Sequence, residues 1–126
     1  MTTHASIPIM KTGAELLAEA RTRITEVSVE QVMEMQRRGD HVTLLDVRDP
    51  HEVNVCKISG AVCISRGNLE SKIESQVTRD ANVVIYCASG NRSVFATETM
   101  KQMGYDNVAS MTGGIRRWID LGGEVE

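Results

Sequence analysis

The residues of this chain best suited to chemistry stand together in residues 86–93, which read Tyr-Cys-Ala-Ser-Gly-Asn-Arg-Ser. Cys87 follows the run Asn-Val-Val-Ile-Tyr, so the sequence predicts a strand that delivers the thiol to a short loop, with a helix beginning where the loop ends. Backbone N–H groups and the positive end of a helix dipole at such a place favour thiolate over thiol. The segment therefore predicts a nucleophilic Cys87 at the floor of a small anion-binding loop.

The rest of the loop has the residue types that anion binding needs. Arg92, five positions after Cys87, supplies a fixed positive charge. Gly90 permits a backbone conformation in which the amides of the loop curl inward. An isolated Cys at a strand end is more often a small buried hydrophobe, but the combination with Gly, Arg and Ser favours a catalytic Cys87. The predicted substrate-binding loop consists of Ala88, Ser89, Gly90, Asn91, Arg92 and Ser93.

The pattern C-x-x-G-x-R-S resembles the active-site loop of the rhodanese-like sulfurtransferases. Three further segments resemble motifs of that family in the same order: residues 46–52 its D-V-R-x-x-x-E, residues 58–62 its I-P-G-A, and residues 112–118 its G-G-x-x-x-W. Two departures are Cys56-Lys57, where the family often has Gly-His, and Ser59 in place of its usual Pro. Neither departure touches the loop, so they bear on local geometry more than on chemistry.

The resemblance implies sulfur transfer. Thiolate Cys87 attacks the outer sulfur of a donor such as thiosulfate and keeps it as a persulfide, and a thiol or cyanide acceptor then removes it. The implied partners are a small anionic sulfur donor and that acceptor, with a protein sulfur donor or acceptor as a further option. No metal or organic cofactor is implied.

Two alternatives stay open at this point. A Cys-based phosphatase or arsenate reductase uses related chemistry, but those enzymes typically place five residues between Cys and Arg, whereas this chain has four. Tyr86 also stands where one major phosphatase class has His. The second alternative is a binding module or persulfide carrier for a dedicated partner.

Charged residues and further thiols lie near the predicted edge of the sheet. Asp46 and Arg48 lie at the end of a predicted strand, and Glu52 follows it. We interpret them as ion pairs that brace the loop or the following turn rather than as catalytic groups. Cys63 lies inside an apolar strand, which predicts a buried core residue. Cys56 has polar neighbours, and its role as a second thiol stays open.

Turn and breaker residues divide the remaining sequence into alternating strands and helices. Residues 1–11 lack periodicity and are expected to be flexible, whereas residues 12–24 have the apolar spacing of an amphipathic helix. Strands are predicted near Val27 and over residues 42–47, 61–64, 82–86 and 107–110, and helices over residues 28–38, 51–55, 68–73, 93–104 and from 115 onward. This order predicts an α/β, rhodanese-like fold: a mostly parallel sheet of about five strands with helices on both faces. The predicted organisation is a single domain over residues 12–126 with an appended N-terminal helix.

Composition narrows the function class and the compartment. At 126 residues with 41% hydrophobic residues the chain is long enough for one buried core, and a net charge of −3 argues against nucleic acid as a partner. Three cysteines without framework spacing suggest a reducing compartment, and no apolar run approaches membrane-spanning length. The three histidines have no metal-ligand spacing. We therefore expect a cytoplasmic protein that contacts neither membrane nor metal.

Overall fold

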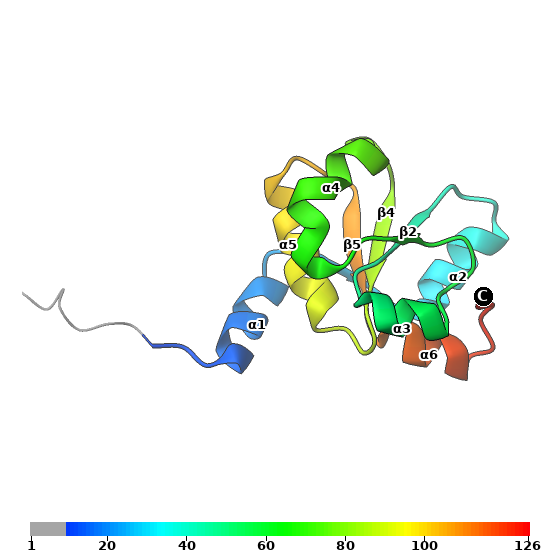
Figure 1. Ribbon diagram of the computed structural model, residues 1–126, viewed down its shortest axis with the longest axis horizontal. Coiled ribbons are helices and arrows are strands. Elements are labelled where there is room, and N and C mark those ends of the chain that lie inside the picture. The colour runs from blue at the N-terminus through cyan, green and yellow to red at the C-terminus, as the bar shows by residue number, and fades with distance from the viewer. Residues whose placement is uncertain (1–9) are drawn as a thin grey trace, which may run out of the picture.

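A five-stranded parallel sheet is the centre of the computed structural model, which describes residues 10–126 (Figure 1). The strands are β1 (Thr25–Val27), β2 (Thr43–Asp46), β3 (Val62–Cys63), β4 (Val83–Tyr86) and β5 (Val108–Met111), in the spatial order β1-β5-β4-β2-β3. Every pair of neighbouring strands is parallel, which confirms the predicted α/β fold class. Because β4 is the middle strand, the residue that follows it emerges at the centre of the carboxyl edge, where such sheets bind ligands.

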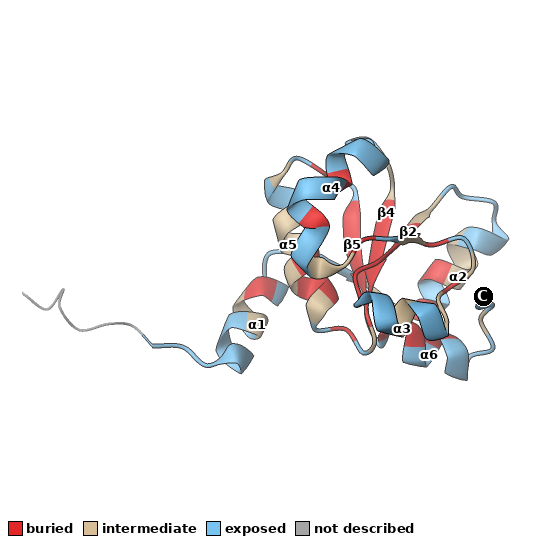
Figure 2. Cartoon of the chain, viewed as in Figure 1, coloured by how far each residue is buried: buried red, intermediate tan, exposed pale blue. Residues whose placement is uncertain are grey.

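Helices cover both faces of this sheet, as the sequence predicts. They are α1 (Gly13–Arg21), α2 (Val29–Arg37), α3 (Pro50–Val55), α4 (Leu69–Gln76), α5 (Arg92–Gln102) and α6 (Gly114–Asp120), with a 3₁₀ turn η2 (Arg66–Asn68) before α4. One core layer joins the sheet to α4 and α5, and a second joins it to α2 and α6. Figure 2 shows the buried residues concentrated on the strands and on the helix faces turned toward them. Both faces of β4 are buried, which accounts for its continuous run of apolar residues.

Local signals in the sequence account for several boundaries of the helices. Ser28 accepts a hydrogen bond from the backbone of Gln31, and the Gln31 side chain accepts one from the backbone of Ser28, which forms a capping box at the start of α2. After α5, Gly104 has a φ of +95°, the left-handed conformation that commonly ends a helix. These two positions show helix ends that are decided by neighbouring residues alone.

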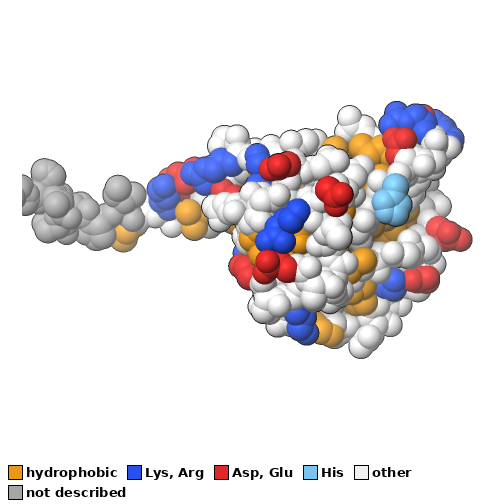
Figure 3. Space-filling model, turned by 90° about the horizontal axis from the view of Figure 1, so that it is seen from above, with side chains coloured by type: hydrophobic (Ala, Val, Ile, Leu, Met, Phe, Trp, Pro, Cys, Tyr) orange, Lys and Arg blue, Asp and Glu red, His pale blue; other side chains and the backbone are white. Residues whose placement is uncertain are grey.

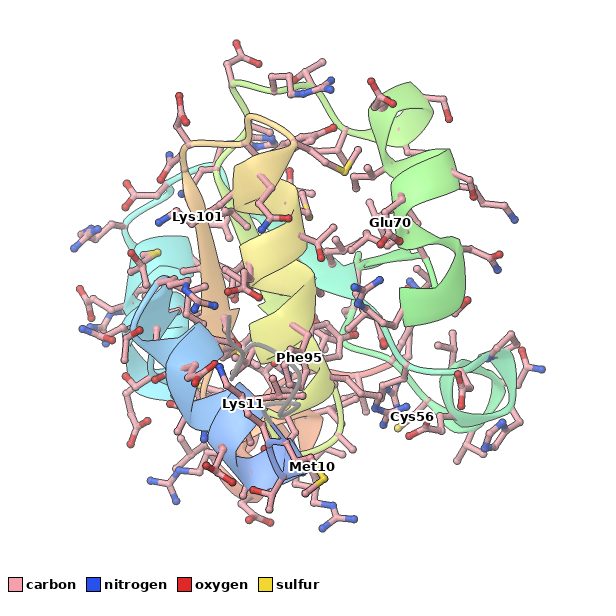
Figure 4. The ribbon with its side chains drawn as sticks, turned by 90° about the vertical axis from the view of Figure 1, so that its left-hand side faces the viewer. Met10, Lys11, Cys56, Glu70, Phe95 and Lys101 are labelled. Carbon is pink, nitrogen blue, oxygen red and sulfur yellow. The ribbon has the colours of Figure 1, made fainter. Side chains whose placement is uncertain are left out.

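The N-terminal helix packs beside α5. Ala20 is its buried residue, the Arg23 guanidinium lies 2.7 Å from the Glu98 carboxylate, and Lys101 donates to the carbonyl of Arg23. Figure 4 shows α1 running along α5, with Met10 and Lys11 at its beginning. The predicted flexibility of residues 1–11 concerns mainly residues 1–9, which lie outside the described residues.

The surface carries its charges in mixed groups. On the face seen in Figure 3, acidic and basic side chains lie interspersed, with small apolar areas between them. Among residues 10–126, none of the helices combines the length and the apolar character needed to cross a bilayer.

Candidate active site

Cys87 occupies the position that the sequence predicts for it, directly after β4 and before α5. The residue is 1% exposed. The backbone N–H of Gly90 donates to Cys87 Sγ at 3.1 Å, and Ser93 Oγ lies 3.6 Å from the same sulfur. Gly90 is buried with a φ of +119°, a conformation that side chains resist and that turns its amide toward the sulfur. The loop thus surrounds one sulfur atom with donors.

These donors outweigh the effect of burial on the thiol. Burial raises the pKa of Cys87. Hydrogen bonds from the Ser93 hydroxyl and from the amides of Ser93, Gly90 and Ser89 lower it by more than burial raises it, so the pKa lies below its ordinary value. The α5 helix begins at Arg92, so the amides of its first turn add the positive end of its dipole. The site can therefore hold a thiolate in a place that excludes most water.

The first turn of α6 is hydrogen-bonded to the backbone of the Cys87 loop. The N–H groups of Ile115 and Arg116 donate to the carbonyls of Cys87 and Ala88, at 3.0 and 3.3 Å. Gly114, with a φ of +58°, allows this approach, because a Cβ atom there would overlap both carbonyl oxygens. The two carbonyls are thereby held against α6, which leaves the loop amides free to face the sulfur. The sequence analysis gives Gly113 and Gly114 only as part of a family motif and does not predict this anchoring role, although two adjacent glycines before a helix are a signal for a close approach.

Arg92, the first residue of α5, forms an ion pair with a residue of α3. Its two terminal nitrogens lie 2.7 and 3.0 Å from the two carboxylate oxygens of Glu52 on α3, and Asp49 lies 3.9 Å away. This bidentate contact lowers the pKa of Glu52 to about 2 and raises that of Arg92. The sequence predicts that Arg92 supplies the positive charge for an anionic sulfur donor. In the structure its guanidinium is paired with Glu52, and 37% of the side chain is exposed.

Asp46 and Arg48 form a second, buried ion pair beneath α3. Arg48 Nε lies 3.1 Å from both Asp46 oxygens and Nη2 lies 2.8 Å from Asp46 Oδ2, and Arg48 also donates to the carbonyl of Cys56 at 2.6 Å. Asp46 is fully buried and Arg48 is 6% exposed. The pair therefore ties the segment after α3 to the end of β2, and neither side chain contacts the sulfur of Cys87 in the hydrogen bonds of the described residues.

The prediction that Cys63 is a core residue is wrong. Cys63 is exposed, because β3 is a two-residue strand at the edge of the sheet and, among residues 10–126, pairs only with β2. The side chain lines a cavity of about 210 Å³ beside Arg48 and Ser65. Partial burial and the nearby Asp46 charge raise the pKa of its thiol, so this cysteine has the opposite electrostatic setting from Cys87. Cys56 is half-buried at the end of α3 (Figure 4).

One group of side chains in the described part of the chain has the composition of a metal site. Potential ligand atoms of Asp49, His51 and Glu52 lie within 4.8 Å of one another. Both oxygens of the Glu52 carboxylate already contact the Arg92 guanidinium, so the positive charge next to these three residues comes from the protein's own arginine. No ligand role for a metal follows from this arrangement.

Comparison with known proteins supports the observed fold and shows the family of the chain. A sequence model of the rhodanese-like domain matches residues 28–121. A sulfurtransferase of Allochromatium vinosum is 32% identical over 99 residues, which cover 79% of this chain and 92% of that protein. YrkF of Bacillus subtilis, named as a candidate sulfur carrier, is 30% identical over 109 residues, or 86% of this chain, but the chain spans only 58% of its length.

A solved structure resembles the chain over nearly its whole length. It is RPA3614 of Rhodopseudomonas palustris, described as a protein of unknown function and possible tyrosine phosphatase. The two are 32% identical with a TM-score of 0.83, and the match covers 95% of this chain and 98% of that one. The family match over most of the chain, the parallel sheet and the C-x-x-G-x-R-S loop around Cys87 lead to one conclusion: the protein belongs to the rhodanese-like domain family.

Proposed function

We propose that this protein is a sulfurtransferase that moves a sulfane sulfur from a small anionic donor such as thiosulfate to a thiophilic acceptor. The observation that carries the proposal is the buried thiol of Cys87, whose pKa lies below its ordinary value because loop amides and the Ser93 hydroxyl surround it. Sulfurtransferases and a candidate sulfur carrier are among the relatives of this family member, which supports sulfur as the transferred atom.

The loop suits each step of such a transfer. Thiolate Cys87 attacks the outer sulfur of thiosulfate, a sulfur–sulfur bond forms, and sulfite leaves with the electron pair of the bond that breaks. The resulting persulfide keeps one negative charge next to the inward-facing amides of the loop. An acceptor thiolate or cyanide then attacks the outer sulfur, and the electron pair returns to Cys87. Because the charge moves between anionic sulfur atoms, the amides stabilise it throughout.

A phosphatase is the second candidate, since the structurally similar RPA3614 is described as a possible tyrosine phosphatase. Two features of this chain weigh against it. Only four residues separate Cys87 from Arg92, which makes a smaller loop than the five-residue spacing typical of those enzymes. The guanidinium of Arg92, moreover, is occupied by both oxygens of Glu52, and a phosphate would have to compete with that carboxylate.

The proposed function is tested by intact mass after incubation with thiosulfate. We expect one added sulfur atom on Cys87, removable by cyanide with release of thiocyanate. Cys87→Ser should fold normally and gain no sulfur, whereas the matched variants Cys56→Ser and Cys63→Ser should still load it. A stable persulfide mapped to Cys56 or Cys63, or turnover in Cys87→Ser, would contradict the mechanism.

A parallel assay separates the candidate functions. The same preparation is given p-nitrophenyl phosphate, thiosulfate and mercaptopyruvate, with release of p-nitrophenol and loading of sulfur as readouts. Phosphate ester hydrolysis without sulfur loading would assign the loop to a phosphatase. Loading that cyanide and small thiols cannot discharge would assign it to a carrier with a protein acceptor.

A further inference from the structure

A chain of two buried hydroxyl groups leads from β5 to the sulfur of Cys87. Ser110 Oγ lies 2.8 Å from Ser93 Oγ, and Ser93 Oγ lies 3.6 Å from Cys87 Sγ. Ser93 and Ser110 are both fully buried. Among the hydrogen bonds of residues 10–126, the Ser110 hydroxyl has Ser93 as its one partner. Within the described residues, the hydrogen bonds therefore link the Ser110 hydroxyl to Cys87 through Ser93.

The strand register places Ser110 on the side of the sheet where the loop lies. Ser110 on β5 is paired with Ile85 on β4, two residues before Cys87. Ile85 and Cys87 belong to the same core layer, the one that α5 covers. Because residues two apart on a strand point to the same face, the hydroxyl of Ser110 rises toward the first turn of α5, where Ser93 lies.

The hydrogens on Ser110 Oγ and Ser93 Oγ both find acceptors within this hydrogen-bonded row only when Cys87 is a thiolate. With a thiolate, Ser110 O–H donates to Ser93 Oγ and Ser93 O–H donates to the sulfur, so that each hydrogen has an acceptor. With a thiol whose S–H donates to Ser93, the Ser93 hydrogen turns to Ser110, and the hydrogen of Ser110 is left without an acceptor. A buried donor without a partner is destabilising, so the two hydroxyls together favour the thiolate.

We propose that Ser110 is a positioning residue for Cys87, which holds the hydroxyl of Ser93 in the orientation that donates to the sulfur. Its consequence for sulfur transfer rests on the proposed function, but its effect on the thiolate does not. In the sequence, Ser110 is a small polar residue in a predicted strand, 23 positions away from Cys87, with no motif to mark it.

Thr97, which lies in α5 with Ser93, offers a matched control for Ser110. It is fully buried like Ser110, and its hydroxyl also contacts Ser93, but it donates to the backbone carbonyl of that residue at 2.7 Å. It therefore shares the burial and the neighbourhood of Ser110 without joining the hydroxyl chain. Thr97→Val keeps the shape of the side chain and removes only this hydrogen bond.

The experiment measures the pH dependence of iodoacetamide alkylation at Cys87, in a background in which Cys56 and Cys63 are Ser. Ser93→Ala should raise the pKa of Cys87 by about 1 or more, since it removes a hydrogen bond to a charged group. Ser110→Ala should raise it by about 0.5, as expected for the loss of a partner that orients and polarises that bond. Thr97→Val should leave the pKa within about 0.2 of the parent value, because its hydroxyl does not take part.

A double variant distinguishes action through Ser93 from a general change in the site. In the Ser93→Ala background, Ser110→Ala should have no further effect on the pKa of Cys87. Ser110→Thr and Ser110→Val form a second pair of equal shape, in which only Thr should keep the parent pKa, and this pair also serves if the Ala variant fails to fold. An unchanged pKa in folded Ser110→Ala, or a shift that persists without the Ser93 hydroxyl, would overturn the proposal.

The outcome is separable from that of the proposed function. If thiosulfate loads no sulfur but Ser110→Ala raises the pKa of Cys87, the proposed function fails and the role of Ser110 stands. If the persulfide forms while the pKa does not respond to Ser110, only the inference about Ser110 fails.

Discussion

Replacing Glu52 by Gln tests whether the ion pair with Arg92 stabilises the folded protein. Gln keeps the size of the side chain and an oxygen that can still accept the backbone N–H of Asp49, the 3.1 Å bond at the start of α3. What is lost is the negative charge opposite the guanidinium, whose nitrogens lie 2.7 and 3.0 Å from the carboxylate oxygens. The variant therefore isolates the charge of the pair.

The magnitude follows from the pKa of Glu52. Its fall from the ordinary 4.5 to about 2 sets an upper limit of about 3 kcal/mol on the contribution to folding. The Arg92 side chain is 37% exposed, and solvent screening reduces this limit, so we expect Glu52→Gln to lose about 1–2 kcal/mol at pH 7. Because the folded-state pKa is lowered, the contribution is complete above the unfolded pKa near 4.5 and is lost as the pH falls toward 2.

Urea unfolding of both proteins at several pH values between 7 and 2 measures this contribution. The difference in free energy of unfolding should be constant from pH 7 to about 5 and should shrink toward zero near pH 2. Glu70→Gln is the control, since Glu70 is 55% exposed in an i,i+4 pair with Arg66 and should cost less than about 0.5 kcal/mol. A deficit in Glu52→Gln that is the same at pH 7 and pH 2.5 would refute the argument.

Three other experiments test the buried ion pair of Asp46, the contact of Gly114 with the loop and the pKa of Cys63. Asp46→Ala leaves the buried guanidinium of Arg48 without its carboxylate and should cost about 3–5 kcal/mol in urea unfolding, and a loss below about 1 kcal/mol would contradict the buried pair. Gly114→Ala should abolish sulfur loading on Cys87, because the added Cβ displaces the loop carbonyls; mass after thiosulfate treatment checks it, and normal loading would disprove the anchoring role. Cys63, studied with the other two cysteines replaced by Ser, should react with iodoacetamide with a midpoint above the ordinary thiol pKa, because partial burial and the Asp46 charge both raise it. A lower midpoint would contradict this combined effect.

Much of the fold is readable along the chain because local features decide it. Breakers and apolar runs place all five strands within a residue or two, and Ser28 and Gly104 mark helix ends that the structure shows. The position of Cys87 between a strand and a helix follows from the same reading. Such signals involve residues close in sequence, so no knowledge of distant packing is needed.

The partners of the charged and polar side chains depend on the folded structure. Sequence alone marks Arg92 as a cation beside an anion site, but only the fold brings α3 close enough for Glu52 to take both of its nitrogens. Cys63 reads as a core residue because an apolar strand does not show whether it lies at the centre or at the edge of a sheet.

The sequence by itself therefore determines where Cys87, the proposed nucleophile, lies between a strand and a helix, and the tertiary structure decides which groups surround it. Gly114 reaches the Cys87 loop across 27 positions and Ser110 reaches Ser93 across 17, through contacts between separate strands and helices. The physical reason is that hydrogen bonds at this site act over about 3 Å in space, while the pattern of apolar residues specifies only elements and their order. The environment of the Cys87 thiol therefore depends on its place in the sequence and on the tertiary contacts of its loop.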